Sequence, residues 1–387
     1  MYKRQAKACD YCGCNMLVTR DKTEVTSYLD RFEVELGRVT DIIGTGRRVA
    51  QVHWGGGTPN YLKNEEIERA LGLLRGAFDI RPDAEVALEI DPRIASPEQA
   101  AFLREAGFNR VSLGVQDFEP FVQKAIGRRQ SRDKTLAVYQ GCRDAGFAGV
   151  NLDLVYGLPG QTRESFAATL DGIIDLQPDR VACFSYAHVP WVRPNQEAID
   201  TSLMLTGYEK FALFQLTVDR FRDGDYTWIG IDHFARKDDE LSVALEQRAL
   251  HRNFMGYATK PAPHMLAFGM SGIGDVCDRF VQNDATYEGW SGKVDAGGLP
   301  VVKGHVLDDD DRRRRQAVLN IMCNLELPWE LTRERWGAPA NELFADALAK
   351  LPPLVDDGLV TLDDDALRIT EKGRYFVRNV AMAFDAY

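Results

Sequence analysis

The sequence has no long apolar run and no excess of basic residues. No stretch of its 387 residues approaches the roughly 20 apolar residues that a helix needs to span a bilayer, and no apolar signal region follows the charged N-terminus. The formal net charge of −11 lacks the basic face that broad nucleic-acid binding requires. We therefore expect a cytoplasmic protein that binds neither membranes nor nucleic acid, with local arginines still available to an anionic small molecule.

Cysteine is also scarce, and its distribution excludes a secreted disulfide framework. The seven cysteines are odd in number, and three of them are crowded between residues 9 and 14. The scattered four lie in apolar runs, so we expect buried core thiols at these positions. They are Cys142, Cys183, Cys277 and Cys323.

The crowded cysteines form the segment Cys9-Asp10-Tyr11-Cys12-Gly13-Cys14. Thiolates are the ligands that zinc and iron–sulfur clusters select, so this loop is a candidate metal site. The spacing alone permits a structural zinc site, but no second CxxC or histidine pair completes a closed set of four ligands. The loop by itself therefore leaves both a zinc module and an iron–sulfur centre open.

Strands and helices alternate after this loop. A helix is predicted over 23–43, and each of the first five strands that follow is apolar and is succeeded by a helix. The predicted strands are 49–54, 85–90, 110–116, 150–156, 180–187 and 226–231. This order predicts a parallel sheet covered by helices, and too few units for an eight-fold barrel favour an open or partial barrel.

Five of these strands end in small or polar residues. The residues at or near the ends are Gly56-Gly57-Thr58, Glu89, Gln116, Asp153 and Tyr186-Ala187-His188. Ligands of parallel sheets bind outside the carboxyl ends of the strands, so the pattern predicts a site there. The lone histidines His53, His264 and His305 are interpreted as structural or solvent-facing.

The last part of the chain predicts a small winged-helix-like domain. Its expected elements are helices over 312–325 and 341–350, a hairpin of 359–362 with 367–370, and a final helix from Glu371. Four aspartates at 308–311 each precede an arginine of 312–315 by four residues, so we expect four intrahelical ion pairs and no nucleic-acid surface. The predicted organisation is a cluster loop at 1–22, an α/β domain at 23–300 and an accessory domain at 301–387.

Together these segments resemble the oxygen-independent coproporphyrinogen III oxidase (coproporphyrinogen dehydrogenase) family of radical S-adenosylmethionine (SAM) enzymes. The resemblance covers nearly the whole chain after Ala6. It rests on an ordered series of motifs: Cys9-Asp-Tyr-Cys-Gly-Cys-Asn15, His53-Trp-Gly-Gly-Gly-Thr-Pro59, Glu89-Ile-Asp-Pro-Arg93, Gly114-Val-Gln-Asp-Phe118, Asp153-Leu-Val-Tyr-Gly-Leu-Pro159, Tyr186-Ala-His188, Asp232-His-Phe-Ala-Arg236 and His251-Arg-Asn-Phe254.

The resemblance implies a partial (β/α)6 TIM-like radical SAM barrel, here without its first strand, and a monomeric oxidoreductase of haem synthesis. Its cofactors would be a [4Fe–4S] cluster and two SAM molecules, and its partners coproporphyrinogen III and an electron donor such as flavodoxin or ferredoxin. A SAM-derived radical would take hydrogen from two propionates in turn, and loss of carbon dioxide would leave the vinyls of protoporphyrinogen IX.

The resemblance also implies roles for single residues. Cys9 and Cys12 would bind the cluster, and Gly56 and Glu89 would hold the first SAM near Tyr11. The residues implied for the second SAM are Gly57, Thr58, Gln116, Arg128, Asp153, Ala187 and Ile273. No catalytic residue is implied, and we predict Arg236 and Arg252 as partners of the substrate propionates.

The sequence departs from the family at its beginning. The family motif is CxxxCxxCxC, whose last three cysteines match Cys9, Cys12 and Cys14, whereas its first falls on Gln5. The last cysteine is not a usual ligand, and Met255 stands where the family commonly has glutamine. We interpret residues 1–5 as the mark of a fragment, a misassigned start or a frame error, and expect this chain to bind a cluster poorly and to turn over slowly.

One alternative within the superfamily is the haem chaperone that shares the scaffold. That family carries His-Asn-x-x-Tyr-Trp where this chain has His251-Arg-Asn-Phe254, and the segment 232–236 also favours the oxidase. A non-catalytic zinc or cluster-binding module is the alternative from a different class.

Overall fold

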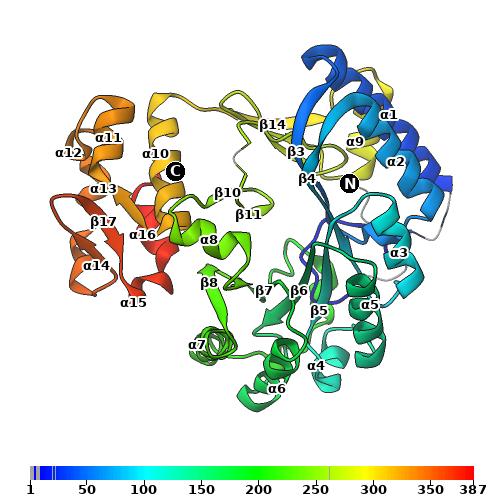
Figure 1. Cartoon of the computed structure of the whole chain (residues 1–387), viewed down its shortest axis with the longest axis horizontal. Coiled ribbons are helices and arrows are strands. Elements are labelled where there is room, and N and C mark those ends of the chain that lie inside the picture. The colour runs from blue at the N-terminus through cyan, green and yellow to red at the C-terminus, as the bar shows by residue number, and fades with distance from the viewer. Residues whose placement is uncertain (1–3, 6–8, 20, 22, 261) are drawn as a thin grey trace. The chain divides into compact units, whose positions relative to one another are not determined.

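The computed structural model describes residues 4–5, 9–19, 21, 23–260 and 262–387 (Figure 1). Parts of the predicted loop 1–22, including Ala6, lie outside these residues. The chain divides into two compact units, of which the first comprises 1–226, 265–274 and 281–304. The second comprises 227–264, 275–280 and 305–387. None of the described helices is long and apolar enough to cross a membrane.

The first unit contains five parallel strands in the order β3-β4-β5-β6-β7. They are β3 (Arg47–Trp54), β4 (Phe78–Ile90), β5 (Arg110–Gln116), β6 (Gly149–Tyr156) and β7 (Arg180–Ser185). Among the described strands β3 pairs only with β4, so it forms an edge and the sheet is open. This confirms the predicted open, parallel α/β architecture, although β4 begins seven residues earlier than predicted, directly after α2.

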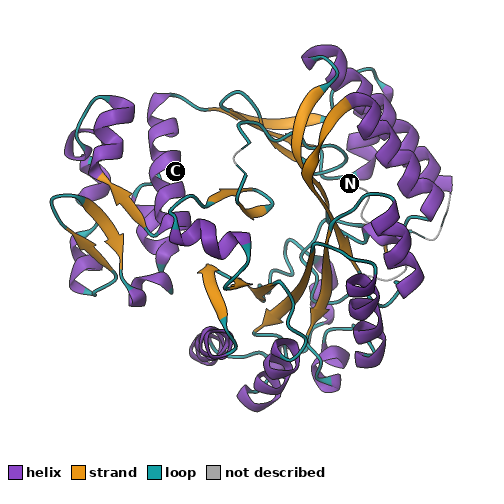
Figure 2. Cartoon of the chain, viewed as in Figure 1, coloured by secondary structure: helices purple, strands orange, loops and turns teal. Residues whose placement is uncertain are grey.

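Helices alternate with these strands along the chain, as Figure 2 shows. They are α1 (Thr23–Ile43), α2 (Asn64–Ala77), α3 (Pro97–Glu105), α4 (Pro120–Ala125), α5 (Arg132–Asp144), α6 (Arg163–Ile174), α7 (Gly207–Asp223) and α9 (Tyr287–Asp295), with short 3-10 turns at Pro59–Tyr61, Pro194–Ala198 and Thr201–Leu203. The predicted start of α3 is confirmed, since the Ser96 hydroxyl accepts a hydrogen bond from the Gln99 amide. Short strands lie at Arg4–Gln5 (β1), which pairs with Leu17–Val18 (β2), and at Ile273–Asp275 (β12), Arg279–Asn283 (β13) and Val301–Val306 (β14).

A buried carboxylate joins distant segments of the first unit. Glu35 of α1 is 2% exposed and accepts hydrogen bonds from the Gly269 amide at 2.9 Å, Asn283 Nδ2 at 2.7 Å and Trp290 Nε1 at 3.0 Å. Burial raises the pKa of Glu35, while its three donors stabilise the charged form. The segments 265–274 and 281–304 are therefore fastened to α1 through one side chain.

We expect Glu35→Ala to lower the free energy of unfolding by about 3 kcal/mol, because three donors on buried residues lose their acceptor. Urea unfolding followed by tryptophan fluorescence would measure the loss. The matched control is Glu33→Ala on the same helix, whose side chain is 53% exposed and pairs with Arg69. It should cost under about 1 kcal/mol, and equal losses in the two variants would contradict the role of Glu35.

The second unit begins with β8 (Tyr226–Gly230), which follows α7 and completes the predicted series of six strands. Its other elements are β9 (His233–Arg236), α8 (Glu240–Glu246), β10 (His251–Asn253), β11 (Gly256–Ala258), α10 (Asp309–Asn324), β15 (Glu326–Pro328), α11 (Trp329–Trp336), α12 (Ala340–Leu343), α13 (Ala345–Leu348), α14 (Pro352–Asp356), β16 (Val360–Leu362), β17 (Ala366–Ile369), α15 (Glu371–Arg374) and α16 (Val377–Ala383). The predicted C-terminal hairpin is confirmed, since β16 and β17 pair antiparallel. Residues of α10 to α16 share one apolar core.

Two detailed predictions differ from the structure. The expected four ion pairs of α10 are only partly formed: Asp310–Arg314 has the predicted spacing, whereas Arg312 pairs with Asp309 and Arg315 with Asp275. The first aspartate is used differently because Asp308 caps the helix. Cys277 is exposed and not a core thiol, since it lies between two short strands; the other three scattered cysteines are buried as predicted.

Candidate active site

One face of the parallel sheet is polar. Along β5 the half-buried residues, including Ser112 and Gly114, alternate with buried valines and leucine. The register places Glu89 beside Ser112 and Gly114 beside Asp153, and the Ser112 hydroxyl donates to Asp153 Oδ1 at 2.8 Å. Since neighbours in register point to the same face, Glu89 and Asp153 lie on the polar face near the carboxyl ends of their strands.

The loop after β3 cradles the Glu89 carboxylate. The Gly56 amide donates to Glu89 Oε2 at 2.7 Å, and His53 Nε2 lies 3.4 Å from Oε1. A Cβ atom at Gly55 would stand 2.5 Å from His53 and 2.6 Å from Glu89, and Gly56 and Gly57 have φ of 79° and 66°. These positions require glycine, and the carboxylate that they hold can bind an ammonium group or hydroxyls.

Arg128 is buried beside this face and contacts several residues at once. Its Nη2 donates to the Gly114 carbonyl at 2.6 Å and lies 3.4 Å from Asp91 Oδ1, and its Nε donates to Gln130 at 2.9 Å. Its Nη1 lies 3.7 Å from Cys9 Sγ. The guanidinium therefore connects the cysteine loop with β5 and with Asp91.

Asp91 binds a second arginine as well. Arg93 Nη2 lies 2.7 Å from Asp91 Oδ2, and its Nε donates to Oδ1 at 3.0 Å. Burial alone would raise the pKa of Asp91, but the hydrogen bonds from Arg93 and the charge of Arg128 outweigh it and lower the pKa. Asp91 therefore stays charged and holds both arginines near Cys9.

The cysteine loop is fixed by side chains from far along the sequence. Asn195 Nδ2 donates to the carbonyls of Cys9 at 3.1 Å, Asp10 at 3.2 Å and Cys12 at 3.0 Å. Gln196 Nε2 donates to the Tyr11 carbonyl at 2.8 Å and to the Ala187 carbonyl at 3.1 Å. These bonds tie the loop to the segment after β7.

The three thiols of the loop differ in exposure. Cys9 is buried, Cys12 is half-buried and Cys14 is exposed. The side-chain hydrogen bond with Cys14 and burial raise the pKa of the Cys12 thiol. The Cys14 amide, which donates to Cys12 Sγ at 3.4 Å, acts in the opposite direction and is outweighed. Within the described part of the chain no three Cys, His, Asp or Glu side chains are gathered to hold one metal ion.

Tyr11 is half-buried and lies between the cysteines in the sequence. It packs against the apolar cluster that contains Ile126, Val155 and Tyr186, and burial raises the pKa of its hydroxyl. Tyr186 follows β7 and contacts His188 Nδ1 through its hydroxyl at 3.0 Å. The loop thus places an aromatic side chain, and not only sulfur, against the carboxyl end of the sheet.

Known proteins have similar sequences over almost the whole length of this chain. A family model described as the radical SAM superfamily matches residues 6–173, and one described as the HemN C-terminal domain matches residues 307–376. The chain is 40% identical over 381 residues to oxygen-independent coproporphyrinogen III oxidase of Salmonella typhimurium, covering 98% of this chain and 83% of that protein. It is 38% identical over 386 residues to the oxidase of that name from Synechocystis sp., covering 99% and 83%.

The solved structure of coproporphyrinogen III oxidase (HemN) from Escherichia coli superposes with a TM-score of 0.97 at 39% identity, covering 100% of this chain and 88% of that one. The chain belongs to the oxygen-independent coproporphyrinogen III oxidase family. Members of this radical SAM family are oxidoreductases, and the family implies a [4Fe–4S] cluster and SAM.

The SAM-binding residues implied by the family fit this structure. The glycines at 55–57 let the loop close on Glu89, and its carboxylate is a suitable partner for the ammonium group or the hydroxyls of SAM. The thiols of the cysteine loop are of the type that binds cluster iron, and Arg128 Nη1 lies 3.7 Å from Cys9 Sγ. Their number is one short, because position 5 carries glutamine.

The predicted residues fall into groups. Tyr11, Arg128 and Cys9 lie together, and Gly56 lies with Glu89. Thr58 is buried, Gln116 ends β5 with φ of 71°, and Ile273 begins β12. Sequence reasoning missed the contacts of His53, Asp91 and Arg93 with this site; the last two stood within a quoted motif but received no role.

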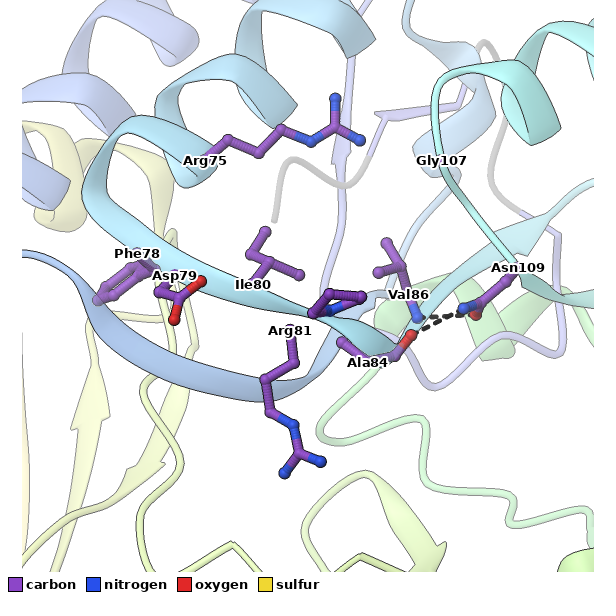
Figure 3. Close-up of a pocket in the computed structure, with 10 residues that line it drawn as sticks. Arg75, Phe78, Asp79, Ile80, Arg81, Ala84, Val86, Gly107 and Asn109 are labelled. Carbon is purple, nitrogen blue, oxygen red and sulfur yellow. Dashed lines mark hydrogen bonds between the residues drawn. The ribbon is translucent and has the colours of Figure 1, made fainter.

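The cavity shown in Figure 3 lies elsewhere in the oxidase fold. It has a volume of about 380 Å³ and is lined by residues that include Arg75, Arg81 and Asn109. Asn109 closes one wall through bonds to Val86 and Ala84. These residues precede the paired part of β4 and β5, at the amino ends, whereas sheets of this kind bind ligands at the carboxyl ends.

Proposed function

We propose that this chain catalyses the oxidative decarboxylation of two propionates of coproporphyrinogen III, giving the vinyl groups of protoporphyrinogen IX. Each propionate would lose one hydrogen atom, one carbon dioxide and one electron. The observation that carries this proposal is 40% identity to a named oxidase over 98% of the chain, combined with a carboxylate and glycine cradle at the strand ends.

When bound, the cluster and SAM supply the hydrogen-abstracting chemistry, and this chain's residues supply placement. Glu89, held by the Gly56 amide, would bind the ammonium or ribose hydroxyls of the first SAM. Tyr11, which packs against the apolar cluster, would form one wall beside it and exclude water. The bonds from Asn195 and Gln196 would keep the cysteine loop in one conformation.

A second SAM would lie along the polar face. We propose Gly57, Thr58, Gln116, Arg128, Asp153, Ala187 and Ile273 as its contacts. Asp153 is oriented by Ser112 and suits ribose hydroxyls. Arg128 carries the charge that suits a carboxylate, although its nitrogens already bond Gly114, Asp91 and Gln130, so it would act from within this network.

Cys9 and Cys12 would bind the cluster, with Gln5 at the position of a third thiolate. Glutamine is a poor ligand for cluster iron, so the wild-type chain is expected to hold little cluster and to turn over slowly. The chain would work as a monomer and take electrons from a small donor such as flavodoxin or ferredoxin.

The test is anaerobic conversion of coproporphyrinogen III with SAM and dithionite, followed by chromatography of the oxidised porphyrins. The variant Gln5→Cys is expected to form protoporphyrin at a rate at least about 10-fold above the wild type, because it restores a direct ligand. The control variant Gln5→Ser should behave as the wild type does. Absence of product from a Gln5→Cys chain that carries a full cluster would refute the proposed reaction.

A further inference from the structure

Arg252 is a half-buried cation, and no carboxylate of the described residues pairs with it. It lies on β10 (Figure 1), and its Nε is buried without a hydrogen-bond partner among the described residues. Other arginines of this unit have carboxylate partners: Arg248 pairs with Glu326, Arg315 with Asp275, and Arg236 with Asp238. An anionic ligand that accepts a hydrogen bond from this buried Nε would gain binding free energy, because it would satisfy a donor that otherwise has no acceptor.

A rigid tyrosine holds Arg252 in place. Arg252 and Tyr257 are register partners in the β10–β11 hairpin, and the guanidinium carbon lies 5.6 Å from the centre of the Tyr257 ring. The Tyr257 hydroxyl donates to the Met322 carbonyl at 3.3 Å. On its other side, a Cβ at Gly230 would stand only 2.4 Å from the Tyr257 hydroxyl oxygen. The ring is therefore fixed on two sides, and the arginine is preorganised by a cation–π contact.

An imidazole contacts the same ring. The His233 and Tyr257 rings meet edge-on with centroids 5.4 Å apart, and His233 Nδ1 lies 2.5 Å from Asp232 Oδ1. Ile231, whose φ is 49°, and Asp232 form the two-residue turn between β8 and β9, so this hairpin places His233 at the start of β9. The Asp232 carboxylate accepts a hydrogen bond from Nδ1 and so fixes the orientation of the imidazole against Tyr257.

The tip of the hairpin is apolar and exposed. Phe254 is 53% exposed and Met255 is 47% exposed, directly after Arg252 and Asn253. Phe254 also packs edge-on against Phe280, at 5.5 Å. A cation beside exposed apolar side chains suits a ligand that combines a flat apolar body with carboxylates.

We propose that Arg252, supported by His233, binds a propionate carboxylate of a tetrapyrrole. That the ligand is a tetrapyrrole rests on the proposed function. That the ligand carries a carboxylate is inferred from the Arg252 Nε, which has no hydrogen-bond partner among the described residues. Arg236, the other arginine predicted for this role, is already engaged by Asp238 at 3.0 Å and is not part of the site.

The experiment compares binding of coproporphyrin III with binding of its tetramethyl ester, which has the same ring without charged carboxylates. Fluorescence titration of the full chain is expected to show that Arg252→Gln weakens coproporphyrin III binding about 10-fold or more and leaves the ester unchanged. His233→Asn should weaken it about 3-fold to 10-fold. Arg252→Lys, which keeps the charge, should lose less than Arg252→Gln, and Arg335→Gln, at an exposed arginine of α11, is the control without effect.

The outcomes separate this inference from the proposed function. If Arg252→Gln binds coproporphyrin III as tightly as the wild type does, the carboxylate site is wrong and the proposed reaction is untouched. If the wild type binds neither porphyrin, the substrate class fails and the site fails with it. If Arg252→Gln loses both porphyrins, Arg252→Lys decides: retained binding of both supports the site, and loss of both overturns it.

Discussion

Replacing Gln5 with cysteine is expected to raise the iron and sulfide content of the anaerobically reconstituted chain to roughly four of each, while the wild type holds far less. The wild type retains two of the expected ligands, Cys9 and Cys12. Loss of the third should lower the affinity for the cluster by on the order of 10-fold to 100-fold or more, because mutation of residues that only support a metal ligand already lowers metal affinity that much. Colorimetric iron and sulfide assays, with the visible absorption of the cluster, measure the difference.

The control for this prediction is Cys14→Ser. Cys14 is exposed and contacts Cys12 through its amide at 3.4 Å, so it is the described thiol best placed to replace a missing ligand. If Cys14 does not substitute, Cys14→Ser leaves the iron content of the Gln5→Cys chain unchanged. A wild-type chain that already holds about four irons and loses them in Cys14→Ser would sink the prediction and assign the third thiolate to Cys14.

The parallel sheet could be predicted because its strands repeat one simple pattern. Apolar runs followed by helices fix the direction of the strands, and the rule for carboxyl ends then brings Glu89, Gln116 and Asp153 to one edge. The start of β4 was missed because Arg81, Pro82 and Asp83 interrupt the apolar pattern. Pairing of Arg47 with Phe78 and of Val49 with Ile80 carries the strand through that segment.

The supports of the cysteine loop could not be predicted from the sequence. Asn195 and Gln196 lie more than 180 residues from the loop and act through backbone carbonyls, which every residue possesses. No spacing rule connects an amide side chain with a distant carbonyl. Asp91 and Arg93 were closer to being found, since a charged pair within an apolar strand region signals a buried network.

Glu89→Gln is expected to weaken SAM binding by about 10-fold to 100-fold, because a charge-assisted hydrogen bond to an ammonium or hydroxyl is worth about 1.5–3 kcal/mol. The amide would still accept from the Gly56 amide, so the fold of the glycine loop should persist. Equilibrium dialysis of SAM against the Gln5→Cys chain, with and without Glu89→Gln, measures the change in Kd.

Glu85→Gln is the matched control, since Glu85 lies on the same face of β4 four residues earlier. It pairs with Arg110 at 2.9 Å, accepts from Gln51 at 2.8 Å and lies 3.9 Å from Arg180. Removal of the Glu85 charge should leave SAM affinity unchanged. It should lower the free energy of unfolding by about 2 kcal/mol at neutral pH, a value that is reduced because solvent screens this partly exposed side chain. A loss of SAM affinity in both variants, or in neither, would contradict the assignment of Glu89.

The acid dependence of stability provides a further test of the ion pairs of Glu85. Burial raises the pKa of Glu85, but the charges of Arg110 and Arg180 and the bond from Gln51 outweigh it, so the folded pKa lies below the unfolded value of about 4.3. The stability that Glu85 contributes is therefore present above about pH 4.3 and is lost as the pH falls through the folded pKa. Urea unfolding across this range should show the gap between wild type and Glu85→Gln closing toward acid, because the variant has no proton to bind at this position.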